Sequence, residues 1–298
     1  MKLTFSCMLG AVASQFIDNH GDFIVSKDNV MQLAKLSSNV YLNNVMSGYQ
    51  TNFTNYTDLS IDKNSVKAVL FTGVPDVDVI AIKGTSMFDL YSCPNSIQFN
   101  YLSHHANDKY NDNLFFSCCK LPFDCQCNST LCTSCKNCYK KSLNFEINYI
   151  KLLHTIVKNY MHNNKKPVIF TGHSLGGGLA AILANMYNKI AVSFQSPGDA
   201  HYIEMTDLPK NDQHVYHFGH DADPIFTGNC GSTCSLFGYN IETKSHTGKT
   251  CNYPAQQKLG IRESIWNHKI QYIINNIIVH WDTDMPTCSR VECQDCIA

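Results

Sequence analysis

The chain has 298 residues, of which 44% are hydrophobic, and this length suits one sizeable α/β domain or two small ones. Its 23 basic and 24 acidic residues leave a net charge of -1. This balance argues against nucleic acid as a partner. The lack of a basic run in the sequence also argues against electrostatic capture by an anionic membrane.

Fifteen cysteines are the strongest compositional signal. Only Cys7 precedes Cys93, and seven of the others lie between residues 118 and 138. Without Cys7, 15 minus 1 leaves 14, an even number that can pair fully. An oxidising compartment would convert these thiols to disulfides, and we expect the cysteines from Cys93 onward to be bonded. Zinc binding by Cys132-x-x-Cys135-x-x-Cys138 is the alternative interpretation.

The N-terminal segment indicates a secretory protein. An apolar run from Leu3 to Ala13, too short to span a bilayer, ends in the small residues Ala11-Val12-Ala13, which resemble a cleavage site. We therefore expect a signal peptide or short signal anchor over residues 1–16 and one folded domain over 17–298. A first buried helix is the alternative. Three glycosylation sequons also favour the secretory pathway: Asn52-Phe53-Thr54, Asn55-Tyr56-Thr57 and Asn128-Ser129-Thr130.

The first half of the domain begins with a helix, a loop and two strands. Apolar residues at helical spacing after a Ser/Asp start predict a helix over 26–42. The polar stretch that follows carries two of the sequons, and we expect it to be a surface loop. Apolar runs at 66–71 and 77–82 predict two strands that are joined by a turn at 73–76.

Residues 87–141 show no clear period and include the cysteine cluster. A stretch of this length without secondary structure is typical of a lid or a binding loop. Its first part, Met87–Leu102, is rich in aromatic and apolar residues. We expect that part to be a mobile flap that exposes apolar surface, with plain core as the alternative.

The second half alternates between strands and helices. A wide apolar stripe at a spacing of 3.6 predicts a helix over 143–160. The elements expected after it are a strand that begins at 168 and leads to Ser174, the helix after Ser174, strands at 190–194 and 214–218, a Cys/Gly/Ser/Thr-rich loop at 227–253 and a last helix at 265–279. This alternation predicts an α/β fold with a doubly wound, mostly parallel sheet.

The segment Val168–Gly178 carries the most specific signal. An apolar β-branched run ends in Gly172-His173-Ser174-Leu175-Gly176 and leads directly into an Ala-rich helix. A Gly-x-Ser-x-Gly turn between a strand and a helix is the nucleophile elbow of α/β hydrolases. The turn lifts the serine hydroxyl off the sheet and points helical amides at the same place. The sequence thus predicts an α/β-hydrolase fold with Ser174 as its nucleophile, while His173 should face sideways in a structural role.

A serine nucleophile needs a histidine to take its proton and an acid to orient that histidine. In α/β hydrolases the chain order is serine, acid, histidine. Asp221 and Asp223 both follow the strand at 214–218 and are candidates for the acid. His268, expected just inside the start of the last helix, is favoured as the base over His246, which lies in a predicted disulfide loop.

An oxyanion hole needs two backbone donors beside the nucleophile. The first is the amide of the residue after the serine, Leu175. The second comes from a loop after an early strand, and Lys83-Gly84-Thr85 follows the predicted strand at 77–82, so that Thr85 could supply it.

With these motifs the chain resembles the class 3 lipases and, within them, the autophagic-body lipases of the fungal vacuole. The resemblance covers about residues 26–298. It implies that Asp223, the aspartate before a proline, is the acid, that His268 is the base and that Thr85 is an oxyanion donor. Further matching segments are Asn111–Cys119, Phe194–Asp199, His217–Ile225, His246–Cys251 and Glu292–Cys296.

The resemblance implies hydrolysis of acyl esters of glycerolipids, above all membrane phospholipids, in a vacuolar, lysosomal or secretory lumen. The expected partner is lipid at a membrane surface. The reaction requires no metal or organic cofactor, no nucleic acid and no obligatory protein partner. Two alternatives stay open: a secreted esterase for a soluble or polysaccharide-linked ester, and a catalytically inactive, cysteine-rich binding protein.

Overall fold

The computed structural model describes residues 15–60, 66–85, 99–117, 144, 147–236, 238–281, 285–292 and 295. The predicted signal segment up to residue 14, most of the predicted flap and the cysteine cluster at 118–138 lie outside these ranges. Phe16, at the predicted boundary, is fully buried, and its amide donates to Asp76 Oδ2 at 2.6 Å.

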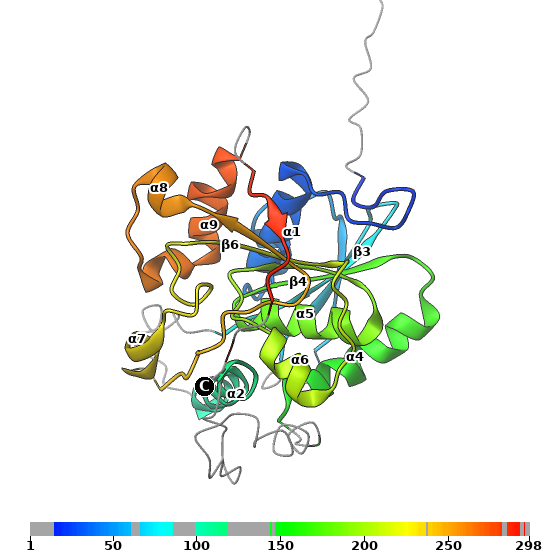
Figure 1. Ribbon diagram of the computed structural model, residues 1–298. Coiled ribbons are helices and arrows are strands. Elements are labelled where there is room, and N and C mark those ends of the chain that lie inside the picture. The colour runs from blue at the N-terminus through cyan, green and yellow to red at the C-terminus, as the bar shows by residue number, and fades with distance from the viewer. Residues whose placement is uncertain are drawn as a thin grey trace, which may run out of the picture.

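The part of the chain that the structure describes forms one sheet of eight strands, and their spatial order follows the chain order (Figure 1). Strands β3 to β7 pair in parallel, while β1–β2, β2–β3 and β7–β8 are antiparallel. The strands are β1 (Asn55–Asp58), β2 (Ala68–Thr72), β3 (Asp78–Ile82), β4 (Val168–His173), β5 (Ile190–Phe194), β6 (Val215–His220), β7 (Lys249–Tyr253) and β8 (Cys288–Ser289). The fold is therefore α/β, with a mixed, mostly parallel sheet of the α/β-hydrolase type.

Helices cover both faces of this sheet. Figure 1 shows α1, α8 and α9 on one side of the sheet and α2, α4, α5 and α6 on the other. The α-helices are α1 (Lys27–Asn39), α2 (Phe99–Phe116), α4 (Tyr149–Asn163), α5 (Leu175–Tyr187), α6 (Ala200–Thr206), α7 (Gly231–Leu236), α8 (Ala255–Leu259) and α9 (Ile270–Asn276). Short 3-10 turns are η1 (Val45–Ser47), η4 (Ile265–His268) and η5 (Ile278–His280). None of the helices described is long and apolar enough to cross a membrane.

The central strands are apolar on both faces because each face is covered. In β3, Ile80 and Ile82 belong to the core under α5, while Val79 and Ala81 belong to the core under α1. Successive strand residues point to opposite faces, so a strand that is buried on both sides is mostly apolar along its whole length. The predicted hairpin of two strands is confirmed as β2 and β3.

Three sequence-based expectations about these elements were wrong. Helix α4 begins at Tyr149, six residues later than expected, because Asn148 caps it by accepting the amides of Ile150 and Lys151. The predicted loop after α1 contains the exposed edge strand β1, in which both Asn52, just before it, and Asn55 face solvent. The predicted loop at 227–253 contains α7 and β7.

Helix α2 lies within the stretch that was predicted to lack secondary structure. Its buried face is partly polar, because Asp108, Asn111 and Asp112 are buried beside apolar residues such as Leu114. Their partners come from other segments: the Tyr149 hydroxyl donates to Asp108 at 2.7 Å, for example. Because polar and apolar residues are mixed on this buried face, the helix has no continuous apolar stripe. The sequence therefore did not predict a helix here.

Two disulfides lie in the described residues, Cys230–Cys234 and Cys251–Cys288. Both agree with the expectation that the cysteines from Cys93 onward are bonded. The second joins the end strands β7 and β8.

Candidate active site

Ser174 lies at a sharp turn between β4 and α5. Its φ of 58° and ψ of -131° are a combination that non-glycine residues rarely adopt and that is typical of a nucleophile elbow. The glycines on either side allow the close packing: a Cβ on Gly176 would lie 2.2 Å from the Ile82 carbonyl oxygen, and one on Gly172 would lie 2.4 Å from the Gly176 carbonyl carbon. The backbone thus presents the serine where β3, β4 and α5 meet.

A chain of hydrogen bonds joins Ser174, His268 and Asp223. His268 Nε2 lies 2.8 Å from Ser174 Oγ, and His268 Nδ1 lies 2.7 Å from Asp223 Oδ2. All three side chains are buried, and the second carboxylate oxygen of Asp223 accepts the Ile225 amide at 2.9 Å. In this geometry the imidazole can accept the hydroxyl proton at Nε2 while its Nδ1–H donates to the carboxylate.

The two aspartates after β6 have different surroundings. Asp223 faces His268, whereas Asp221 accepts the backbone amide of Gln256 at 2.9 Å at the start of α8. Asp221 therefore closes a turn, a common role for aspartate. The structure brings Asp223, and not Asp221, to the histidine.

The position of His268 differs from the expectation. It ends the 3-10 turn η4 and does not open an α-helix, because Lys269 has an extended backbone (φ -63°, ψ 129°) that separates η4 from α9. The single helix predicted at 265–279 is therefore three short pieces. A helix N-terminus does not surround the imidazole, so other contacts must hold it in place.

His173 supplies such a contact. Its Nε2 lies 2.6 Å from the backbone carbonyl oxygen of His268, and its Nδ1 lies 3.0 Å from the Tyr41 hydroxyl. Burial, with the charge of His268 as a smaller cause, keeps the pKa of His173 well below 6.5, so this ring is neutral. Its one proton must be on Nε2 to donate to the carbonyl, and Nδ1 then accepts from Tyr41. His173 thus holds the backbone of His268, a contact that the sequence did not reveal.

The loop after β3 packs against the first turn of α5. A Cβ on Gly84 would lie 2.3 Å from the His173 carbonyl oxygen and 3.3 Å from the Gly176 amide. This contact packs the loop that leads to Thr85 against the turn at Ser174 and the first turn of α5, which begins at Leu175. The roles of the Thr85 and Leu175 amides as oxyanion donors stay a prediction.

Asp112 supports this loop and was not among the predicted site residues. The Thr85 hydroxyl donates to Asp112 Oδ2 at 2.6 Å, and both side chains are buried. Burial raises the pKa of Asp112 well above 3.8. The sequence feature that could have identified Asp112 is the segment Asn111–Cys119, which contributes to the resemblance to the lipases.

His246, the second candidate for the base, is not at this site. It is buried beside Asp199 and its ring stacks on His217 and on Phe226. The sequence-based preference for His268 agrees with this placement.

The sheet, the elbow and the three hydrogen-bonded side chains define an α/β-hydrolase site. A family model described as a Tle-like phospholipase domain matches residues 133–222. The chain is 33% identical to "Putative lipase ATG15" of Saccharomyces cerevisiae (strain S288c), over 92% of this chain and 56% of that protein. It is 34% identical to the protein of the same name in Eremothecium gossypii, over 92% of this chain and 54% of that one.

The chain thus spans about half the length of the curated relatives that it matches. The predicted resemblance to the lipases is confirmed over nearly all of this chain. Among solved structures, the Rhizomucor miehei lipase propeptide complex aligns with a TM-score of 0.39 and 13% identity, covering 79% of this chain and 71% of that one. This structural similarity is low, and the fold is assigned from the order and pairing of the strands alone.

Proposed function

We propose that this protein is a serine lipase or phospholipase that hydrolyses acyl esters of glycerolipids in membranes. The observation that carries the proposal is the hydrogen-bonded chain from Ser174 through His268 to Asp223 at a strand–helix elbow. The names of the matched family and of the curated relatives support lipid as the substrate class.

The first half of the proposed reaction forms an acyl-enzyme. Ser174 Oγ attacks the acyl carbonyl while His268 Nε2 takes its proton, and Asp223 stabilises the imidazolium that results. The amides of Leu175 and Thr85 donate to the oxyanion. The tetrahedral intermediate then collapses, His268 gives its proton to the departing alcohol oxygen, and the lysolipid leaves.

Water completes the cycle in the same geometry. It gives a proton to His268 as its oxygen attacks the acyl carbon, and the second intermediate releases the fatty acid and restores the Ser174 hydroxyl. Every step uses groups of the chain, the ester and water.

We place the protein in the lumen of the secretory pathway, in a vacuole or lysosome or outside the cell. The apolar N-terminal run, the exposed Asn52 and Asn55 of two sequons and the two disulfides support this location. If the segment at 1–16 is retained, it attaches the enzyme to the membrane that it degrades.

The test compares three substrates: phosphatidylserine vesicles, a triacylglycerol emulsion and a short p-nitrophenyl ester in solution. A lipase turns over the aggregated lipids faster than the dissolved ester. Ser174→Ala, His268→Ala and the double variant should each lose on the order of a thousandfold in kcat or more, because the groups act as a unit. Preference for the dissolved ester would favour a secreted esterase. Wild-type protein without activity on all three would favour a binding protein.

A further inference from the structure

A second cluster of ionisable side chains is buried outside the proposed active site. Asp199 precedes α6, His217 lies in β6, and His246 lies in the segment before β7. His217 Nε2 is 3.4 Å from Asp199 Oδ1, and His246 Nδ1 is 3.9 Å from the same oxygen. One atom from each residue lies within 4.8 Å of the other two.

The facing ring nitrogens make no well-aligned hydrogen bond. His217 and His246 are 0% and 4% exposed, yet His217 Nε2 and both nitrogens of His246 make no hydrogen bond with the described residues. Buried polar atoms in folded proteins are nearly always bonded, and exceptions call for a ligand, a water or an ion. His217 Nε2 and His246 Nδ1 face the same carboxylate oxygen, Asp199 Oδ1, which points to a missing ligand between them.

The composition of the cluster suits a cation. A buried carboxylate is costly unless it is paired or coordinates a metal, and the imidazole nitrogen is the commonest metal ligand in proteins.

The outer atoms of the cluster are already held in place. His217 Nδ1 lies 2.8 Å from Ser193 Oγ and 3.1 Å from Ser196 Oγ. Asp199 Oδ2 accepts the Thr247 hydroxyl at 2.5 Å, and Oδ1, the oxygen that faces the histidines, also accepts the Thr247 amide at 3.0 Å. Hydrogen bonds of this kind on the far side of histidine and carboxylate ligands orient the ligands of metal sites.

We propose that Asp199, His217 and His246 bind one zinc ion. Two imidazoles and one carboxylate, with a fourth position left to water, are a recurrent zinc set. Ligands about 2.1 Å from a tetrahedral ion are about 3.4 Å apart. The His217–Asp199 separation equals this value, and the His246–Asp199 separation exceeds it by 0.5 Å (3.9 minus 3.4).

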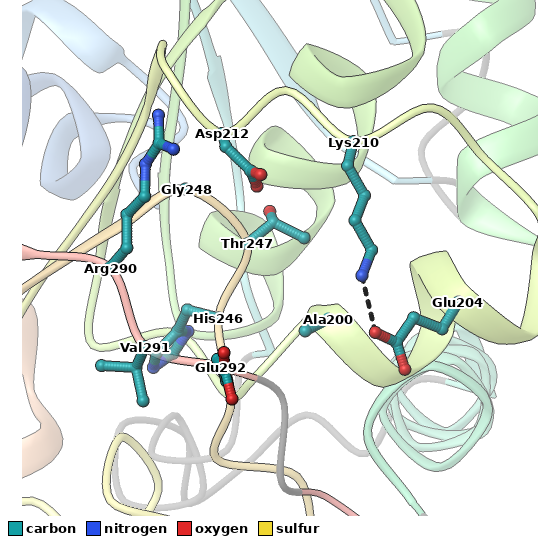
Figure 2. A pocket seen from close by; sticks show the side chains of 10 residues that line it. All are labelled: Ala200, Glu204, Lys210, Asp212, His246, Thr247, Gly248, Arg290, Val291 and Glu292. Atoms are coloured by element: carbon teal, nitrogen blue, oxygen red, sulfur yellow. Dashed lines mark hydrogen bonds and ion pairs between the residues drawn. The ribbon is translucent and has the colours of Figure 1, made fainter.

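One member of the cluster borders a pocket. A pocket of about 600 Å³ is lined by His246 and Thr247 together with charged residues that include Arg290 and Glu292. Figure 2 shows His246 on the wall of this pocket, next to Val291. The bound ion would tie the start of α6, the strand β6 and the approach to β7 together, a stabilising role that is separate from the chemistry at Ser174.

The test measures zinc in the full chain. Protein purified with zinc present is dialysed against metal-free buffer, and zinc is counted by mass spectrometry. We expect one ion per chain. Chelator treatment should remove it and lower the melting temperature by roughly 5 °C or more, and added zinc should restore that temperature. Cobalt(II) in its place should give the visible bands of a tetrahedral site without a thiolate charge-transfer band.

Variants assign the site. His217→Gln and His246→Gln should each abolish stoichiometric zinc and the thermal shift, while His280→Gln, a change at an exposed histidine, should keep both. Wild-type protein that holds no zinc and shows no thermal shift with the metal would overturn the proposal, even where a variant fails to fold. So would a folded His217→Gln protein that still holds one zinc. Activity is not the readout, so this result is independent of the proposed lipase.

Discussion

At the scale of single residues, the proposed triad depends on which of two neighbouring aspartates contacts the base, His268. Asp221 and Asp223 are two positions apart, and only Asp223 reaches His268. The turn after β6 directs the other carboxylate outward to the Gln256 amide. Asp112 acts one contact further away, through the hydroxyl of Thr85. Both cases yield predictions that a matched substitution tests.

Asp223→Asn should lower kcat by on the order of a thousandfold or more, because an amide cannot stabilise the imidazolium. Asp221→Asn is the matched control, since its amide oxygen can still accept the Gln256 N–H, and it should stay within about twofold of wild type. Steady-state kinetics on lipid vesicles measure both variants. Equal losses in the two variants, or a larger loss at Asp221, would remove Asp223 from the proposed triad.

Asp112→Leu should lower kcat about tenfold with little change in KM, because the buried Thr85 hydroxyl then lacks an acceptor at a cost of about 1–3 kcal/mol. Asp112→Asn should keep most of the activity. Burial raises the pKa of Asp112, so its carboxyl is biased toward the neutral form that the amide resembles. Melting curves should show that both variants fold. An Asn variant as impaired as the Leu variant would mean that an ionised carboxylate is needed.

At the scale of elements, a disulfide closes the segment that carries the base. Cys251 in β7 is bonded to Cys288 in β8, and His268 lies between them. His268 belongs to a short 3-10 turn with extended backbone on both sides, so the element that carries it is not rigid by itself. The disulfide and the contact with His173 anchor the segment to the sheet.

Replacing both Cys251 and Cys288 by Ala should lower the free energy of unfolding by about 4 kcal/mol, the chain-entropy value for a loop of 37 residues. The Cys230–Cys234 bridge spans only 4 residues, so its removal should cost about 2 kcal/mol and serves as the matched control. Urea unfolding measures both. A larger loss from the short bridge would contradict this entropic explanation.

At the scale of the whole molecule, stability should depend on pH through buried histidines. The pKa of His173 is held well below 6.5 by burial, so the folded state keeps this ring neutral while the unfolded chain protonates it below pH 6.5. The unfolded state then binds more protons, and stability rises with pH in that range. The contribution is fully present above pH 6.5 and is lost as pH falls toward the folded pKa.

The variant His173→Gln isolates this contribution, because glutamine does not titrate and can donate to the His268 carbonyl. Between about pH 7 and about pH 4.5, wild-type protein should lose more unfolding free energy than the variant. Asp112, whose pKa is raised, shifts stability in the opposite direction, but it is present in both proteins and cancels in the difference. Parallel pH profiles would show that His173 is not held neutral in the fold.

The local sequence determined the elements whose pattern is complete within a few residues. The sequence here has a β-branched run, then Gly-x-Ser-x-Gly, then an Ala-rich segment. These three patterns predict β4, the elbow at Ser174 and α5. Strand β5 was predicted with its observed bounds, because four of its five residues are apolar and it is buried on both faces. The order serine, acid, histidine and the resemblance to lipases limited the partners of Ser174 to a few residues.

Only the tertiary structure decided contacts between distant segments. Asp112 meets Thr85 across 27 residues, and Tyr41 meets His173 across 132, because packing of α1 and α2 on the sheet brings them together. No local period encodes such a pair. Helix α2 was missed for the same reason, since its buried polar residues are satisfied by other segments. Residue types therefore predicted which groups could react, whereas packing decided which of them meet.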